Sequence, residues 1–213
     1  INRSPHEVAI NFEKTDEEIE IIIKEANEIL FEIRSKRIRP HLDDKILASW
    51  NGLMIGAMAR AGDILGGQKY INAAGKAAEF IWDKLFIETG RKLLHRWRDG
   101  EARFDATLDS FAFLIRGFLE YAEAVMGNSF IGKALELQRQ QDQLLYDAVN
   151  RGSYTSREAS DIIIRPSNMY DGAEPSGNSI RVMNPLKSRA INGDKELKEK
   201  AEKPRNTFTT NIK

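Results

Sequence analysis

The chain has 213 residues, of which 41% are hydrophobic and 30% are charged, and it contains no cysteine. This balance is typical of a globular protein with a sizeable core and excludes a disordered chain. The 32 basic and 32 acidic side chains cancel, so we expect no nucleic-acid partner, because the attraction to phosphate groups is missing. The absence of cysteine excludes disulfides, thiolate zinc sites and thiol nucleophiles.

No apolar run approaches the roughly 20 residues that cross a bilayer, and the first residues lack the basic-then-apolar order of a signal peptide. We therefore expect a cytoplasmic chain with no membrane partner. The sequence starts at Ile1 rather than at Met, as a piece of a longer protein would.

Apolar residues that recur with a helical period predict a series of helices. Thr15 and Glu18 form a capping box before the first one, and Asp43 or Asp44 is expected to cap the second. In chain order the expected helices are 16–37, 44–65, 69–86, 107–126, 129–147 and 176–191.

These helices alternate between an inner and an outer kind. Helix 107–126 is apolar almost all round, which is typical of an inner helix enclosed by others. Helix 129–147 contains the polar stretch QRQQDQ, so only one apolar face can be buried and we expect an outer helix. Inner helices begin at Asp44, Asp109 and Ser176, which are 65 and 67 residues apart, with short turns after them and long connections before them. The repeat predicts an all-α fold of stacked antiparallel hairpins, an incomplete α/α toroid over residues 1–203.

Other features refine this expectation. The pattern of residues 152–165 predicts a small β-hairpin in one long connection, and residues 204–213 are predicted to form a disordered tail. Pro185 lies inside the last helix, where it costs about 3 kcal/mol. With too few hairpins to close a ring, helix 107–126 should expose an apolar flank, to be covered by a partner or by self-association.

The long connections should gather on one rim with the N-termini of the inner helices, whose free N–H groups suit anionic or hydroxyl-rich ligands. Two carboxylates across a cleft serve glycoside hydrolysis, and a histidine with a carboxylate serves proton abstraction in sugar epimerisation. The candidate catalytic residues are Asp44, His95, Asp109 and Glu174. The candidate substrate-binding residues are Asp43, Trp50, Asn51, Arg96, Trp97, Asp99, Asp171, Ser176 and Asn178.

Each candidate also has a structural interpretation. Aspartate and serine at helix starts are common caps, and Trp50 lies on an apolar stripe that is typical of a core position. Three histidines without cysteine do not indicate a metal site, and we expect neither metal nor cofactor. The alternative to an enzyme is a non-catalytic helical scaffold or binding module, in which hydrogen bonds within the protein occupy these polar groups.

Four strings carry a family resemblance: RPHLDDKILASWNGLMIGAMARAG (39–62), LLHRWRDGEA (93–102), LDSFAFLIRGFLEYAEA (108–124) and YDGAEPSGNS (170–179). They resemble the spermatogenesis-associated protein 20 family, also called DUF255 or YyaL-like proteins. The resemblance implies an (α/α)6 toroid similar to N-acylglucosamine 2-epimerases and six-hairpin glycosidases, preceded by a thioredoxin-like domain. That domain and the closing hairpins are missing here, and a carbohydrate is the implied ligand of a sugar epimerase or glycoside hydrolase.

The sequence departs from the family pattern at three places. The usual LDDYAF reads LDSFAF, so that Ser110 replaces a carboxylate, and the usual GGYF reads RGSY at 151–154. After Ser179 the expected apolar helix becomes IRVMNPLKSRA.

Overall fold

The computed structural model describes residues 3–127, 129–148, 152–159 and 162–192. The chain divides into two compact units, one that ends at Asp43 and one that begins at Asp44, and each is considered by itself. The predicted single domain over 1–203 stays a prediction. The predicted tail, 204–213, lies outside the described residues.

The first unit is a pair of helices, α1 (Pro5–Asn11) and α2 (Asp16–Ser35). The predicted capping box of α2 is confirmed: the Glu18 N–H donates to Thr15 Oγ1 at 3.2 Å and the Thr15 N–H donates to Glu18 Oε2 at 2.9 Å. Within this unit α2 leaves large apolar side chains exposed, among them Ile29, Leu30 and Phe31.

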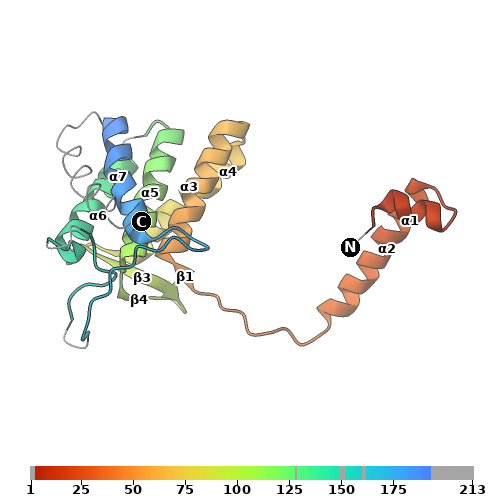
Figure 1. The fold of residues 1–213 in the computed structure, drawn as a ribbon, viewed down its shortest axis with the longest axis horizontal. Helices are drawn as coiled ribbons and strands as arrows, with labels where there is room; N and C mark the ends of the chain where they lie inside the picture. The colour runs from red at the N-terminus through yellow and green to blue at the C-terminus, as the bar shows by residue number, and fades with distance from the viewer. Residues whose placement is uncertain (1–2, 128, 149–151, 160–161, 193–213) are drawn as a thin grey trace, which may run out of the picture. The chain divides into compact units, whose positions relative to one another are not determined.

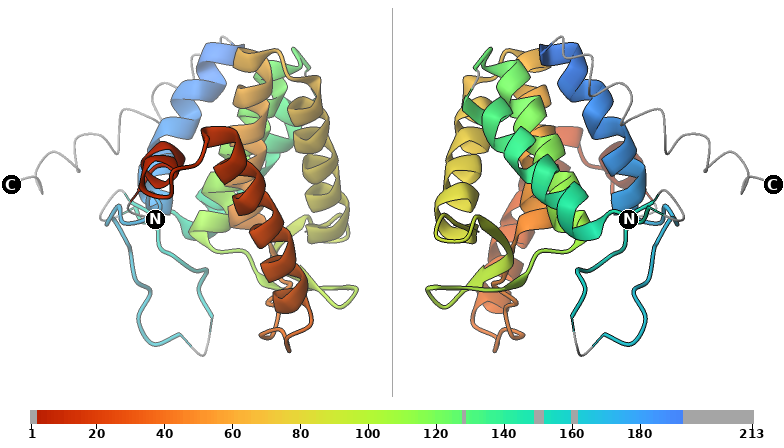
Figure 2. Two further views of the ribbon diagram at one scale, coloured as in Figure 1. Left: turned by 90° about the vertical axis from the view of Figure 1, so that its right-hand side faces the viewer. Right: turned by 90° about the vertical axis from the view of Figure 1, so that its left-hand side faces the viewer.

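The second unit contains the helical hairpins (Figures 1 and 2). Its helices are α3 (Ala48–Leu65), α4 (Gln68–Leu85), α5 (Leu108–Ala124), α6 (Ser129–Leu145) and α7 (Gly177–Asn192). Helix α5 packs against α3, α6 and α7, and α4 packs on α3. Helices α3, α5 and α7 start at the same end of the unit, as the repeat predicts (Figure 1).

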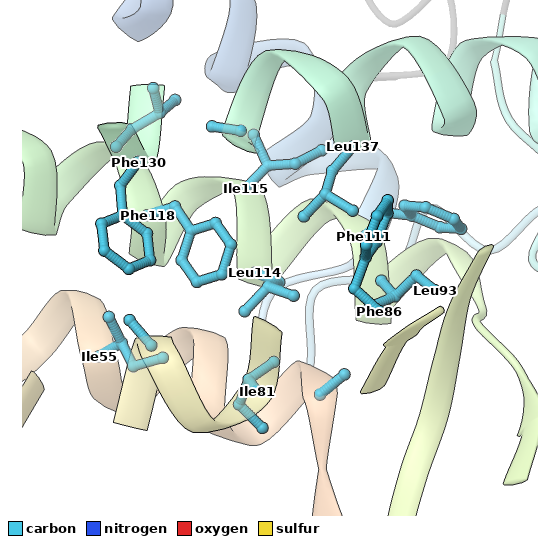
Figure 3. Packing of buried hydrophobic residues seen from close by; sticks show 14 of the residues in the cluster. Ile55, Ile81, Phe86, Leu93, Phe111, Leu114, Ile115, Phe118, Phe130 and Leu137 are labelled. Atoms are coloured by element: carbon cyan, nitrogen blue, oxygen red, sulfur yellow. The ribbon is translucent and has the colours of Figure 1, made fainter. Parts of the chain in front are cut away.

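Small residues allow α3 and α5 to approach closely. A Cβ atom at Gly52 would lie 2.4 Å from the backbone carbonyl carbon of Phe113, and one at Gly117 would lie 2.3 Å from the Gly52 oxygen. The core forms around α5, where Phe111, Leu114 and Phe118 are buried between the neighbouring helices (Figure 3). This packing fixes the start of α5 in place.

A small antiparallel sheet lies at the end of the unit where the inner helices begin (Figure 1). Its strands are β1 (Ile46–Leu47), β2 (Phe86–Ile87), β3 (Lys92–Arg98) and β4 (Glu101–Asp105), and β3 pairs with the other three. We did not predict it. The available signal was Asp99-Gly100, both with positive φ (52° and 78°), at the two central positions of a hairpin turn that favours this dipeptide.

Two predictions about local structure are wrong. Helix α3 is not capped by Asp43 or Asp44: it begins at Ala48 after the N-cap Leu47, which has no side-chain bond, because Ile46 and Leu47 pair with β3. The described part of 152–165 is not a β-hairpin, and a single bridge joins Ser153 to Tyr146. Several of its backbone bonds go to other elements, as when the Leu108 N–H donates to Thr155 O at 2.9 Å.

The burial of the helices also differs from expectation. Helix α5 has no apolar flank open to solvent among its described residues, because α3, α6 and α7 bury its residues from Leu108 to Leu119, except Asp109 and Arg116, which are partly exposed. In α6, Gln138, Gln140 and Gln141 are buried, although we expected the QRQQDQ stretch to face solvent. Pro185 lies inside α7 as predicted.

Candidate functional site

The start of α5 brings a histidine and an aspartate together. Thr107 is the N-cap of α5, and its Oγ1 accepts from the Ser110 N–H at 3.4 Å. Strand β3 places His95 beside this turn, with its Nδ1 atom 3.0 Å from Ser110 Oγ. Leu93, His95 and Trp97 alternate along β3 on the face toward the helices, since Leu93 is in the core and Trp97 contacts Phe80 of α4.

His95 is half-buried, and its surroundings favour the neutral imidazole. Burial lowers the pKa of His95, and the positive charges of Arg96 and Lys45 act in the same direction, while the Asp109 carboxylate opposes them. A neutral imidazole at neutral pH can accept a proton.

Asp109 is the neighbouring acid, in the first turn of α5. Burial raises the pKa of Asp109; the Gly177 backbone N–H lowers it, Glu174 raises it and His95 lowers it. The start of α7 lies directly against this carboxyl group, because a Cβ atom at Gly177 would be 2.4 Å from Asp109 Oδ1. A carboxyl group with a raised pKa is suited to donate a proton.

Glu174 and two aromatic side chains form the rim of a hollow next to these residues. Trp50, Asn168, Tyr170 and Glu174 line this hollow of about 460 Å³, together with the backbone around Gly172. Trp50 is 62% exposed and Tyr170 79% exposed, so the expectation that Trp50 lies in the core is wrong. No described residue makes a hydrogen bond or ion pair with the Glu174 carboxylate, which is exposed.

The other candidate residues around β3 already interact with side chains of the protein. The Asp44 carboxylate, 50% exposed, pairs with Arg98 Nε at 2.8 Å, and Asp99 lies 3.4 Å from the same atom in the exposed β3–β4 turn. The Arg96 guanidinium lies over the Phe104 ring, 4.9 Å from its centroid.

Asn51 and Trp97 do not join the His95–Asp109 pair either. Asn51 donates to the Leu47 carbonyl at 2.9 Å within its own helix, and Trp97 packs on the core. Asp43 belongs to the first unit, where it is exposed.

The polar residues at the start of α7 hold the long connection before it. Asn178 is 1% exposed; its Oδ1 accepts from the Ser153 N–H at 2.9 Å, and its Nδ2 donates to the carbonyls of Ser153 and Asn168. Ser176 Oγ accepts from the Ser179 N–H at 3.2 Å. Hydrogen bonds from the Ser176 N–H and the Ser179 hydroxyl lower the pKa of Asp171. Asn178, Ser176 and Asp171 therefore have a structural role, because their polar groups bond within the protein. This is the alternative to ligand binding that the sequence also allowed.

Sequence reasoning missed Ser110, Tyr170 and Gly177 as parts of the site. Ser110 was noted only as a lost carboxylate, although the third residue of a helix is where a side chain can reach back to its cap. Across the described residues there is no group of three or more His, Asp or Glu side chains that could hold a metal ion. In the same part of the chain, none of the helices has the length and apolar character needed to span a membrane.

Comparison with known proteins gives relatives at about one-third identity. Spermatogenesis-associated protein 20 of Rattus norvegicus is 33% identical over 195 residues, which are 86% of this chain and 25% of the relative. The uncharacterized protein B0495.5 of Caenorhabditis elegans is 34% identical over 92% of this chain and 27% of its own length. The chain therefore spans about a quarter of the curated relatives, and no family model matches it.

Solved structures with this fold are sugar-processing enzymes of low sequence identity. Cellobiose 2-epimerase from Bacillus thermoamylovorans has a TM-score of 0.66 at 14% identity, covering 80% of this chain and 46% of that one. Unsaturated glucuronyl hydrolase from Bacillus sp. GL1 has a TM-score of 0.61 at 15% identity, covering 82% and 49%. The likeness establishes an α/α toroid fold, of which the chain supplies less than half of each neighbour's length.

Proposed function

We propose that this chain, which belongs to the spermatogenesis-associated protein 20 family, binds a sugar at the start of α5 and carries proton-transfer residues of a sugar epimerase or isomerase. One observation carries the proposal. His95 and Asp109 lie together with pKa values displaced in opposite directions, the imidazole toward its neutral form and the carboxyl toward its protonated form. The lowered pKa suits His95 to act as a base, and the raised pKa makes the Asp109 carboxyl better suited to act as an acid.

The chemistry follows from these two groups. The neutral imidazole of His95 removes the proton on the carbon next to the carbonyl of an open-chain sugar. The Asp109 carboxyl group gives its proton to the carbonyl oxygen, so that an enediol forms without a net change in charge. Return of the proton to either face or to the neighbouring carbon then gives an epimer or an isomer.

The aromatic hollow supports a sugar as the ligand. Trp50 and Tyr170 expose ring faces that suit the apolar C–H faces of a pyranose, and Glu174 and Asn168 offer hydrogen bonds to its hydroxyl groups. Among proteins of the same fold are cellobiose 2-epimerases and a D-mannose isomerase, although at 15% identity or less.

Exchange of sugar protons in heavy water tests the proposal. The chain is incubated with a panel of aldoses, ketoses and disaccharides, and NMR follows deuterium uptake at the carbon beside the carbonyl. We expect uptake with at least one sugar and its loss in His95→Gln and Asp109→Asn. His6→Gln is the matched control, because His6 is exposed and its ring pairs with Asp16 of the first unit. No exchange with any sugar in the unaltered chain would contradict the proposal.

A glycoside hydrolase is the second candidate. It is favoured by the two carboxylates, because the charge of Glu174 helps to raise the pKa of Asp109, as expected for a general acid next to a base or nucleophile. Release of reducing sugar from a glycoside without proton exchange would select this reaction. Binding of sugar without either reaction would select the binding module.

A further inference from the structure

The Ser110 hydroxyl makes three close contacts in a fully buried position. Its oxygen lies 3.0 Å from His95 Nδ1, 3.1 Å from Thr107 Oγ1 and 3.3 Å from the Thr107 backbone nitrogen. The Ser110 side chain is 0% exposed. Because water cannot reach it, its hydrogen bonds must be made within the protein.

A serine hydroxyl has one proton to give and two lone pairs to offer. The Thr107 N–H occupies one lone pair. Two arrangements satisfy the remaining contacts: the Thr107 hydroxyl donates to Ser110 Oγ and the Ser110 hydroxyl donates to His95 Nδ1, or the Ser110 hydroxyl donates to Thr107 Oγ1 and accepts from a proton on His95 Nδ1. Only the second leaves Nε2 unprotonated, as the proposed function requires of a base. The imidazole then has its proton on Nδ1 and a free lone pair on Nε2.

We infer that Ser110 is a positioning residue for His95: it accepts a hydrogen bond from Nδ1–H and leaves Nε2 unprotonated, as the nitrogen that takes a proton from the ligand. The inference rests on the proposed function, which needs a base. It also assigns to Ser110 a role that capping of α5 does not require, because a cap would not orient an imidazole or select its tautomer.

The charged groups around the His95 ring determine its pKa, and they indicate which substitution should change it. Arg96 and Lys45 favour the neutral ring, and Asp109 favours the charged one. Ser110 adds a neutral partner. Replacing it with aspartate would place a carboxylate against Nδ1, so Ser110→Asp should raise the pKa of His95.

Nitrogen NMR of the imidazole rings tests this inference without a ligand, because the two nitrogens have different shifts in each tautomer. His95→Gln identifies the resonances among the three histidines of the chain. We expect the Nδ1–H tautomer in the unaltered chain and a shift toward Nε2–H in Ser110→Ala. Ser110→Thr should restore the Nδ1–H form, because it keeps the hydroxyl.

Thr107→Ser is the matched control. It keeps the hydroxyl that accepts the Ser110 proton and removes only the Thr107 methyl group, so His95 should keep the Nδ1–H form. A dominant Nε2–H form in the unaltered chain would overturn the inference, as would equal His95 spectra in Ser110→Ala and Thr107→Ser. If the tautomer is as inferred but no sugar exchanges protons, the proposed reaction fails and the positioning by Ser110 stands.

Discussion

The starts of α5 and α7 carry the same kinds of residues and use them differently. At α7, Asn178 and Ser176 are buried; the Asn178 side chain bonds to the backbone of the preceding connection, and Ser176 Oγ accepts from the Ser179 N–H of α7. At α5, Asp109 is partly exposed with a raised pKa, and His95 Nδ1 lies against Ser110 Oγ, which leaves Nε2 as the nitrogen that we propose faces a ligand. The number of hydrogen bonds already made, and not residue type or position, separates a structural helix start from a candidate site.

The largest effect expected from this contrast is at Asn178. Asn178→Ala removes the partners of the Ser153 N–H and the Asn168 carbonyl, and buried polar groups without partners cost about 1–3 kcal/mol each. We expect a loss of about 3 kcal/mol in the free energy of unfolding, measured with urea. Asn51→Ala is the control and should lose less than about 1 kcal/mol, because its bond lies within one helix. Equal losses would show that the α7 start is not the more firmly bonded region.

Gly177 connects the two helix starts. Gly177→Ala would place a Cβ atom 2.4 Å from Asp109 Oδ1 and 2.8 Å from Leu108 Cγ, and such overpacking costs about 1–3 kcal/mol. We expect a lower thermal midpoint and an altered pKa of Asp109. Gly132→Ala in α6 is the control, since its Cβ would meet nothing within 4 Å, and it should be neutral or stabilising. An unchanged thermal midpoint in Gly177→Ala would contradict the close contact between the starts of α5 and α7.

A smaller effect is expected at the α7 cap. Ser176→Ala removes the acceptor of the Ser179 N–H, so stability should fall by about 1 kcal/mol. Sugar binding and proton exchange, measured on the folded fraction, should not change. If Ser176→Ala loses proton exchange while its folding is unchanged, Ser176 belongs to the ligand site and its role as a cap is contradicted.

The smallest effect on stability is expected at Asp109. Because its folded pKa is raised above the usual aspartate value of 3.8, its contribution to stability is present below about pH 3.8 and is lost as pH rises through the folded pKa. Asp109→Asn removes this loss of stability at higher pH, but it also removes the favourable interaction of the carboxylate with the helix N-terminus. The two effects oppose each other. Stability at pH 7 should therefore stay within about 1 kcal/mol of the unaltered chain, and the gain relative to it should increase from pH 3 to pH 7. A variant that loses more stability at pH 7 than at pH 3 would make Asp109 an ordinary cap.

The sequence was sufficient for the helices and their repeat, because apolar periods and glycine turns are local signals. It did not predict the sheet around β3, although Asp99-Gly100 marks the turn, and so it placed the start of α3 too early. Burial was also partly mispredicted, since Trp50 is exposed and Gln141 is buried. Such positions depend on which distant helix lies opposite, as with Gly177 against Asp109, and spacing along the chain does not contain that information.

Mapping of sugar binding by amide NMR tests the central claim most directly. The chain is titrated with the sugar that exchanges protons best, and shift changes are assigned along the second unit. The account predicts that the changes gather at His95, Asp109, Ser110 and Glu174, with little change at Ser153 and Asn178. Shift changes centred on the α7 bonds, or none at saturating sugar, would contradict a ligand site at the start of α5.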